Sequence, residues 1–325
     1  MILCRERIVI PSMIGCDGLM KLLYVLTAPC LLFYFAACDL GVEPDPVEED
    51  EVVKRELTPD QRRRKEGANL FAQDGAIPSG TKMKQSRDVT MSNLGVNVTQ
   101  GGKRVATGQA DIAYEETRDA TLVSKSITKF VMGDAGLKMK LALRNQPPNE
   151  ELTPYPLQGQ TIVRDGEQIS MEEVPNDEQK EALNSFRAPW FGGNRLFVDA
   201  AIKRGDKWDV TPETVLEAIF SETFKDGSGQ VKLSIQKFFS FEGVDSAEVT
   251  VSLHRCRGTM VDSKGQEIEI ELQGYGTLYR SLDSLHTTRV DIDGTAQLKM
   301  TQGDTELLFN GPFECIAKSD VVLPN

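Results

Sequence analysis

Residues 267–272 read Glu-Ile-Glu-Ile-Glu-Leu, and this strict alternation of charged and aliphatic residues decides the fold class. Successive side chains of a β-strand point to opposite faces, so a period of two predicts a strand with a core on one side and water on the other. Residues 137–144, Leu-Lys-Met-Lys-Leu-Ala-Leu-Arg, repeat the alternation. A third run, 290–300, places its apolar residues on one face and has Gly294 in its middle. The three runs predict a sheet with one apolar face.

Further strand-like runs and glycine-containing turns extend this pattern along the chain. The runs are 105–115, 123–131, 231–235, 249–253 and 307–313, and the turns are 101–102, 133–136, 165–166, 227–229, 264–265 and 303–304. Several strands exceed the usual mean of about 5 to 6 residues, and long strands twist and coil. We therefore predict a mainly β fold: a long, curved antiparallel meander, shaped like a half-barrel or clam, with two or three short helices.

The helices are predicted from their start signals. Asn176, with Gln179 in the capping-box position, begins a helix over 176–186. A second helix begins at 211–212 and carries an apolar stripe, which suits a lid or plug on the sheet. A third begins at 58–61, where a threonine, a proline and a glutamine have the same capping-box spacing.

Residues 20–38 have the organisation of an export signal. Lys21 supplies a short positive region, and 22–37 are apolar apart from Thr27 and Pro29. This run is short for a membrane span, which needs about 20 apolar residues. It ends in Phe-Ala-Ala-Cys at 35–38, which resembles the lipobox of bacterial lipoproteins, where small residues precede the cysteine. The resemblance implies cleavage before Cys38, a diacylglyceryl thioether on its sulfur and an acylated new amino terminus. An uncleaved anchor helix and an ordinary secretory signal are the alternatives.

The expected organisation follows from these signals. Residues 1–37 are the signal peptide, with translation expected to start at Met20 because charged residues interrupt the pattern before it. Residues 38–57 comprise the lipidated Cys38 and an acidic stretch of low hydrophobicity, which predicts a disordered tether. Residues 58–80 are a short helix and linker. Residues 81–320 form a single β-rich domain, which could consist of two halves meeting near 190–210.

The C-terminal half carries a second resemblance. Gly-Asp-Lys-Trp at 205–208 opens a strand-rich region that contains Gly-Tyr-Gly-Thr-Leu-Tyr at 274–279 and Asp-Ile-Asp-Gly at 291–294. Residues 155–320 thereby resemble an uncharacterised β-rich domain family of bacterial envelope proteins. The resemblance implies a fold class and an envelope location, but no activity. The plan is also similar to that of periplasmic lipid carriers, in which a curved antiparallel sheet clasps helices, although function does not follow from fold.

Candidate catalytic groups are few. The chain has no phosphate-binding loop or dinucleotide motif, and the Asp-Gly-Ser-Gly at 226–229 lacks the first glycine of a nucleophile elbow. His254 and His286 are the two histidines, so a hydrolytic triad would have to use one of them. The formal net charge of −12 disfavours nucleic acid as a partner.

Two cysteines inside the predicted domain could form a disulfide in an oxidising compartment. By alternation from 249–253, Cys256 shares the outer face with His254, whereas Cys315 lies on the core face, and this difference argues against Cys256–Cys315 pairing. His254 and Cys256 supply only two ligands, too few for a zinc site. The acidic pair in 291–294 lacks the spacing of a calcium loop. No metal or cofactor is expected.

These observations favour a non-enzymatic lipoprotein of the cell envelope, anchored to the inner or outer membrane through Cys38 and facing the periplasm or the exterior. Its curved sheet would bind an apolar ligand, a lipid or another envelope protein. Two alternatives stay open: a structural or assembly module with a closed core, and an envelope hydrolase that uses His254 or His286.

Overall fold

The computed structural model describes most of the predicted domain and little before it. The described residues are 62–63, 66–71, 77–144, 146–166, 168–186, 194–220, 223–261 and 267–324. The predicted signal peptide, Cys38 and the acidic tether lie outside them, as does most of the first predicted helix, of which Arg62, Arg63 and Glu66 are described and helical. No helix within the described ranges is both long and apolar enough to cross a membrane.

The fold is one open antiparallel sheet of twelve strands, in the order β7-β6-β4-β3-β2-β14-β13-β12-β11-β10-β9, with β5 paired to β4. Its strands are β2 (Lys82–Gln100), β3 (Lys103–Leu122), β4 (Ile127–Leu143), β5 (Asn149–Pro154), β6 (Thr161–Asp165), β7 (Gln168–Met171), β9 (Lys207–Val210), β10 (Lys225–Phe241), β11 (Val244–Val261), β12 (Glu267–Ser281), β13 (Thr287–Gln302) and β14 (Thr305–Val322). A separate ribbon pairs β1 (Ala68–Asn69) with β8 (Ala201–Ile202). The predicted mainly β fold is confirmed.

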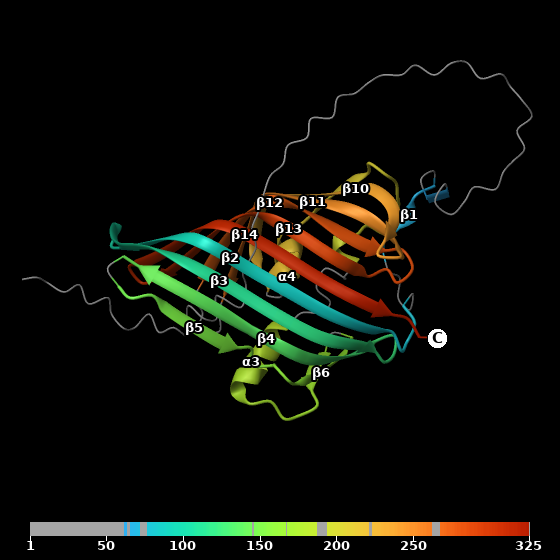
Figure 1. Cartoon of the computed structure of the whole chain (residues 1–325), viewed down its shortest axis with the longest axis horizontal. Coiled ribbons are helices and arrows are strands. Elements are labelled where there is room, and N and C mark those ends of the chain that lie inside the picture. Colours follow the sequence, from blue (N-terminus) through green and yellow to red (C-terminus); the bar gives the residue numbers. More distant parts are fainter. Residues whose placement is uncertain are drawn as a thin grey trace, which may run out of the picture.

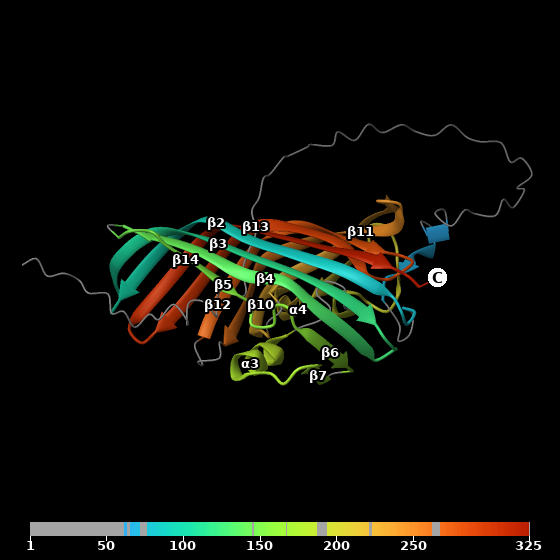
Figure 2. The same ribbon diagram turned by 60° about the horizontal axis from the view of Figure 1, so that its bottom comes forward.

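Two meanders meet in the middle of this sheet. Consecutive strands pair from β2 to β4 and again from β9 to β14. The two runs are joined where the C-terminal β14 pairs with β2 over almost its whole length. Figures 1 and 2 show the sheet arching over the two α-helices, α3 (Asp177–Ser185) and α4 (Pro212–Phe220), while the short 3-10 helix η2 spans Asn194–Leu196. The predicted curvature is therefore present, with the helices on the concave side.

The concave face is apolar because the strands keep their alternation. In β12, for example, Ile268, Ile270 and Leu272 are buried and the glutamates between them face outward. One large cluster of buried side chains extends from β10 to β4 around α4, and a smaller one lies under α3. Gly294 stands directly opposite Gly274 on β12, and a Cβ atom on either would lie 2.1 Å from a backbone oxygen of the other strand. The predicted mid-strand glycine thus permits a close approach of two strands.

Both helices within the domain begin as predicted. The Asn176 side chain accepts a hydrogen bond from the Gln179 backbone N–H, and the Gln179 side chain accepts one from the Asn176 N–H, which completes the capping box of α3. Thr211 precedes α4, and its hydroxyl oxygen accepts a hydrogen bond from the Thr214 N–H at 3.4 Å. The predicted end of the first helix at Pro189 lies outside the described residues.

Two glycine-containing segments predicted as turns lie inside strands instead. Residues 133–136 belong to β4, where the pairing register with β3 shifts opposite Thr117, and a Cβ on Gly133 would meet the Thr117 hydroxyl at 2.4 Å. Residues 227–229 belong to β10, where the register shifts again and Gly229 has a φ of +99°. In both places the glycines form a β-bulge, which bends a long strand without ending it.

The strand predicted over 123–131 is also wrong at its start. β3 ends at Leu122 and β4 begins at Ile127, so 123–126 form the turn between them. The Ser124 hydroxyl accepts a hydrogen bond from the Ile127 N–H at 3.2 Å, a local bond that serine commonly makes in turns. The predicted hairpin turns at 101–102, 165–166 and 303–304 are confirmed, and 264–265 lie outside the described residues.

Candidate functional site

The candidate site is the concave face of the sheet around α4. This helix is buried along most of its length, with Val215, Leu216, Ile219 and Phe220 each at most 1% exposed. Its apolar stripe predicts a lid or plug, and the helix lies on the sheet as such a plug would. Gly258 of β11 allows this close packing, because a Cβ there would lie 2.7 Å from the Leu216 side chain.

Polar contacts hold both ends of α4. At its start, the Glu213 carboxylate accepts a hydrogen bond from the Gly227 backbone N–H at 2.8 Å, which ties the helix to the bulge of β10. At its end, the Arg87 guanidinium on β2 donates to the carbonyl oxygen of Ile219 at 2.9 Å. The last four carbonyls of a helix have no partner within the helix, so a cation at this position satisfies one of them and complements the helix dipole.

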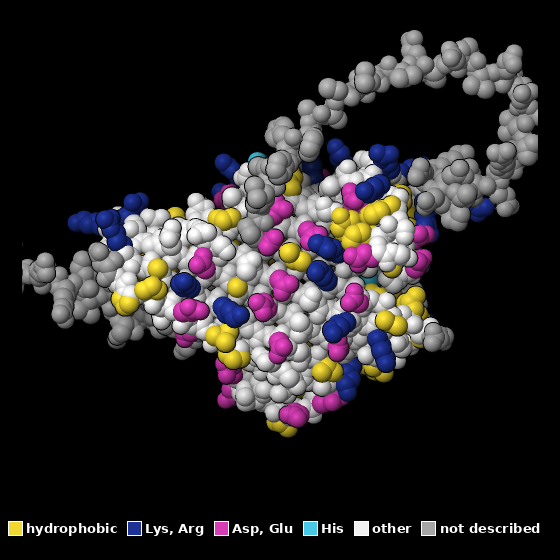
Figure 3. All heavy atoms as spheres, in the orientation of Figure 1, with side chains coloured by type: hydrophobic (Ala, Val, Ile, Leu, Met, Phe, Trp, Pro, Cys, Tyr) yellow, Lys and Arg dark blue, Asp and Glu magenta, His cyan; other side chains and the backbone are white. Residues whose placement is uncertain are grey.

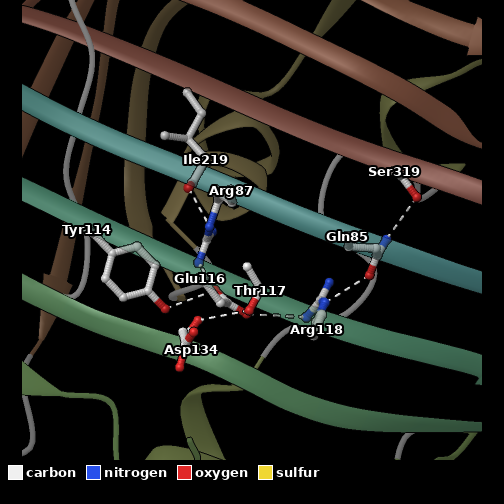
Figure 4. A network of polar contacts seen from close by, with 9 residues as sticks. All are labelled: Gln85, Arg87, Tyr114, Glu116, Thr117, Arg118, Asp134, Ile219 and Ser319. Atoms are coloured by element: carbon white, nitrogen blue, oxygen red, sulfur yellow. Dashed lines mark hydrogen bonds and ion pairs between the residues drawn. The ribbon is translucent and has the colours of Figure 1, made fainter.

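Arg87 also belongs to a buried ionic cluster with Glu116 and Arg118 of β3 (Figure 4). Arg87 Nη2 lies 2.5 Å from Glu116 Oε2, and Arg118 Nη1 lies 3.8 Å from Glu116 Oε1. The Tyr114 hydroxyl donates to the same carboxylate at 2.9 Å. Arg118 Nε donates to the Gln85 side chain at 2.8 Å. Because all three charged side chains are at most 4% exposed, each depends on the others for compensation.

Aromatic rings complete the surroundings of these arginines. The guanidinium carbon of Arg87 lies 5.2 Å from the centre of the Tyr114 ring, and that of Arg118 lies 5.2 Å from Phe130 and 5.6 Å from Phe186. Such cation–π contacts stabilise a positive charge that water no longer reaches. Phe130 and Phe186 belong to the smaller apolar cluster and Tyr114 to the larger, so the ionic cluster lies between the two.

Burial sets the protonation of this cluster. Desolvation, followed by the Glu116 charge, holds the pKa of Tyr114 well above its usual range, so the phenol stays neutral. Desolvation also lowers the pKa of Arg118 to about 10, which leaves the guanidinium charged at neutral pH. Desolvation acts on Arg87 in the same direction, but the Glu116 carboxylate and its other neighbours outweigh it and raise the pKa. At neutral pH the Tyr114 phenol is therefore neutral and both guanidinium groups are charged.

A third buried arginine, Arg280 of β12, lies elsewhere on the concave side. Its Nε and Nη2 atoms donate to the carbonyl oxygen of Leu70 at 3.2 and 3.0 Å, and its guanidinium carbon lies 4.4 Å from the centre of the Phe197 ring. Desolvation lowers the pKa of Arg280 to about 9. Neighbouring His286 is also buried, and desolvation followed by the Arg280 charge lowers its pKa to about 4. His286 is therefore neutral at physiological pH.

The two histidines are not brought together with a nucleophile. His254 is exposed on β11, while His286 is buried beside the turn between β12 and β13. Within the described residues, neither imidazole hydrogen-bonds to a serine, a cysteine or a carboxylate, and His286 Nδ1 has no hydrogen-bond partner. The described part of the chain likewise holds no group of three or more metal-binding side chains. Asp291, from the acidic pair, instead accepts two hydrogen bonds from Arg289.

The prediction that Cys256 lies on the outer face with His254 is wrong. Arg255 has a φ of +46°, and the pairing of β11 with β12 skips two residues between Leu253 and Cys256. This bulge turns Cys256 inward, where it is 0% exposed like Cys315. Its thiol donates a hydrogen bond to the Pro212 carbonyl oxygen of α4, with a sulfur–oxygen distance of 3.8 Å.

The Cys256–Cys315 disulfide does not form, and both residues are free thiols. They lie on β11 and β14, which are separated in the sheet by β12 and β13. Strands are spaced about 4.8 Å apart, so three steps exceed the Cα separation of about 4.4 to 6.8 Å that a disulfide allows. Desolvation raises the pKa of each thiol to about 12, which makes both unreactive.

The network of Gln85, Arg87, Glu116 and Arg118 was not predicted from the sequence. The strand alternation could have indicated it, because residues two apart in a strand face the same side. Arg87 lies two residues before buried Val89, and Glu116 lies two residues after buried Tyr114, so both polar side chains point inward. Polar side chains at inward positions of neighbouring strands indicate a buried network. The lipidation site Cys38 lies outside the described residues.

The fold and site together define a class of protein: an open, curved β-sheet with a helix held on its apolar concave face.

No family model and no curated protein matches the sequence. Among solved structures, one described as "lipid-protein interactions in lipovitellin" is similar with a TM-score of 0.38 and 11% identity, over 77% of this chain and 26% of that chain. The chain thus spans about a quarter of the lipovitellin chain.

A second similar structure is a DUF1329 family protein from Desulfovibrio piger, with a TM-score of 0.15 and 9% identity, over 77% of this chain and 88% of that chain. At these identities and TM-scores, neither similarity defines a shared function.

Proposed function

We propose that this chain is a membrane-anchored lipoprotein of the cell envelope that is not an enzyme and that holds an apolar ligand on its concave face. The observation that carries the proposal is the position of α4, an apolar helix seated on the inward face of an open sheet. An apolar ligand would be accommodated by the same inward side chains that pack against this helix. The proposed ligand is a lipid acyl chain, whose burial gains about 0.8 kcal/mol per CH₂.

The proposed anchor rests on the lipobox-like residues 35–38 and on the acidic stretch that follows them. Two or three acyl chains on Cys38 would hold the protein on a bilayer, whereas one chain alone binds only marginally. The acidic tether within residues 38–57, followed by the helix and linker predicted over 58–80, would then connect the lipid to the domain.

A non-enzymatic role is supported by the surroundings of the ionisable groups. Glu116 is engaged by two arginines and a tyrosine, and His286 is buried and neutral beside Arg280. General acid–base catalysis requires a group that titrates near the working pH and reaches its substrate. Tyr114, Arg118 and His286, whose pKa values lie far from neutral pH, do not meet that requirement.

Mass spectrometry of the full chain, extracted gently from the membranes of the cells that make it, tests this proposal. Under denaturing conditions, we expect the chain to begin at Cys38 and to carry the mass of its acyl groups. Under native conditions, we expect an additional non-covalent mass that organic extraction removes and identifies as lipid. A chain without acyl groups would refute the anchor, and an acylated chain without non-covalent lipid would refute the ligand.

The second candidate is a structural module with a closed core, and the buried ionic cluster favours it. Arg87 connects β2, β3 and the end of α4 through one guanidinium, an arrangement that fixes the helix in place. If α4 never leaves the sheet, no inward surface becomes available to a ligand. An acylated, lipid-free chain in the native spectrum is the result that this candidate predicts.

A further inference from the structure

One end of the sheet, here called the strap end, holds the segment that leads toward the proposed anchor. We call the described residues of 62–71 the strap. Leu70 of the strap is fully buried in the larger apolar cluster, and its carbonyl oxygen accepts both hydrogen bonds from Arg280. Arg63 forms an ion pair with Asp245, which lies in the β10–β11 hairpin. The strap is therefore fixed to the domain.

The antiparallel order places several other segments at the same end. The strands pair so that the β10–β11 hairpin, the β12–β13 turn, the β3–β4 turn and the C-terminal end of β14 all lie there. Figure 1 shows β1 of the strap and the C-terminus together at the right-hand end, and Figure 2 agrees. The β2–β3 and β13–β14 hairpins lie at the opposite end.

The length of chain between the anchor and the strap determines which end of the sheet lies nearer the bilayer. Residues 39–61 connect Cys38 to the strap. A Gly/Ser-rich coil of that length would span about 26 Å on average, and self-repulsion of acidic residues would increase that span. β2 and β3 contain 19 and 20 residues, which at about 3.3 Å per residue gives a sheet roughly 60 Å long. An anchored domain therefore keeps its strap end near the bilayer more easily than its far end.

The surface of the strap end suits contact with lipid. Val123, Val244, Val322 and Leu323 are large apolar side chains exposed there, with Val322 63% exposed. On the outer face of the same end, the rings of Phe241 and Tyr279 are stacked with centroids 4.2 Å apart, and Phe239 contacts both.

Basic side chains accompany this apolar surface. Lys237 Nζ lies 4.5 Å from the centre of the Phe239 ring, and Lys82 and Lys125 are exposed at the start of β2 and in the β3–β4 turn. Figure 3 shows hydrophobic side chains near β10 and β11 with both Lys or Arg and Asp or Glu side chains beside them. Aromatic rings flanked by lysine are typical of side chains at the membrane–water interface, where the ring meets the apolar layer and the amine meets the headgroups.

We propose that the strap end is the membrane-facing surface of the domain, and that its exposed apolar and aromatic side chains contact the surface of the bilayer that carries the anchor. This inference rests on the proposed lipid anchor. It adds a fixed orientation: the strap, the β10–β11 hairpin and the C-terminus lie toward the lipid, and the β2–β3 hairpin lies away from it.

Two exposed valines near opposite ends of β3 provide a matched test, because Val123 directly follows the strand at the strap end and Val105 lies in the strand near the far end. Val123→Cys and Val105→Cys are each made in the full chain, and the new thiol is labelled with a fluorophore. In the processed, acylated protein, cleavage has removed residues 1–37 and the Cys38 sulfur is a thioether. Cys256 and Cys315 are buried, so no native thiol competes for the label. The acylated protein is placed in phosphatidylcholine vesicles that contain spin-labelled phosphatidylcholine, and the loss of fluorescence is measured.

We expect the label at 123 to be quenched several-fold more strongly than the label at 105. Equal quenching, or stronger quenching at 105, in a protein whose mass shows acyl groups on Cys38 would overturn the orientation alone. A mass without acyl groups would remove the anchor and, with it, the orientation. Circular dichroism of both labelled variants confirms that each is folded.

Discussion

At the scale of single residues, Glu116 is the most consequential side chain of the interior. It is the carboxylate that Arg87 and Arg118 share, and the Tyr114 hydroxyl donates to it as well. A buried charge that loses its counter-ion cannot recover solvation, so such clusters are costly to break although they contribute little net stability when intact.

Replacing Glu116 with Gln is therefore expected to lower the free energy of unfolding by about 3 to 5 kcal/mol. Urea denaturation followed by circular dichroism measures the change. The matched control is Glu267→Gln, which removes a solvent-exposed ion pair with Lys225 and should change stability far less, because water and salt screen exposed ion pairs. Equal effects of the two substitutions would contradict the burial argument.

His286 gives the protein a defined acid sensitivity. Its folded-state pKa is about 4, whereas an unfolded histidine titrates near 6.5. Below about pH 6.5 the unfolded chain takes up a proton that the folded chain does not, so stability falls as pH falls and is restored as pH rises.

Between pH 7 and pH 5, this single group is expected to lower the free energy of unfolding by about 2 kcal/mol. Urea midpoints measured at both pH values test it, with His286→Gln as the variant. The variant should lose this part of the pH dependence. If its midpoints shift with pH as much as those of the unsubstituted chain, another group is responsible.

At the scale of elements, the long strands were predictable because alternation is a local property of the sequence. Residues 267–272 and 137–144 lie within β12 and β4 with the predicted faces buried. β2 was not among the named strands, because Gln85 and Arg87 occupy inward positions that an apolar pattern would fill. Their partners lie on β3, α4 and β14, which no local pattern identifies.

Bulges account for most of the remaining errors. A glycine in a bulge and a glycine in a hairpin turn give the same local signal, so 133–136 and 227–229 were predicted as turns. The bulge at Arg255 also reverses the alternation that placed Cys256 outside. The helices were predicted well, because the capping residues Asn176 and Thr211 are specific signals.

The packing of α4 against β11 yields a prediction at this scale. Gly258→Ala would place a methyl group 2.7 Å from the Leu216 side chain and 3.0 Å from the Phe224 ring, so it should destabilise the protein by about 1 to 3 kcal/mol. Gly95→Ala is the control, because its nearest neighbour, a backbone oxygen, is 3.6 Å away. Thermal unfolding of both variants distinguishes overpacking from a general effect of losing a strand glycine.

At the scale of the whole molecule, the β14–β2 pairing joins the two meanders into one sheet. Arg87 adds a second connection, since it lies on β2 and binds the end of α4. β2 and β14 therefore depend on each other, although more than 200 residues separate Lys82 from Val322 in the sequence.

Removing residues 305–325 is expected to prevent folding of both meanders, because β13 and β2 each lose a partner and the apolar cluster loses Leu307, Phe309 and Phe313. Removing only 323–325, which follow the last strand, should leave the fold unchanged. Limited proteolysis and circular dichroism compare the two truncations. A folded core in the longer truncation would show that one meander is independent.

The central claim is that the concave face holds an apolar ligand, and photolabelling tests it most directly. The full chain is irradiated with a palmitic acid that carries a diazirine, with and without excess palmitic acid, and the modified residues are mapped by mass spectrometry. We predict competed adducts on α4 and on inward residues of β10 to β14, such as Val251, Ile270 and Leu298. Adducts confined to outward residues, or none that palmitic acid displaces, would contradict the account.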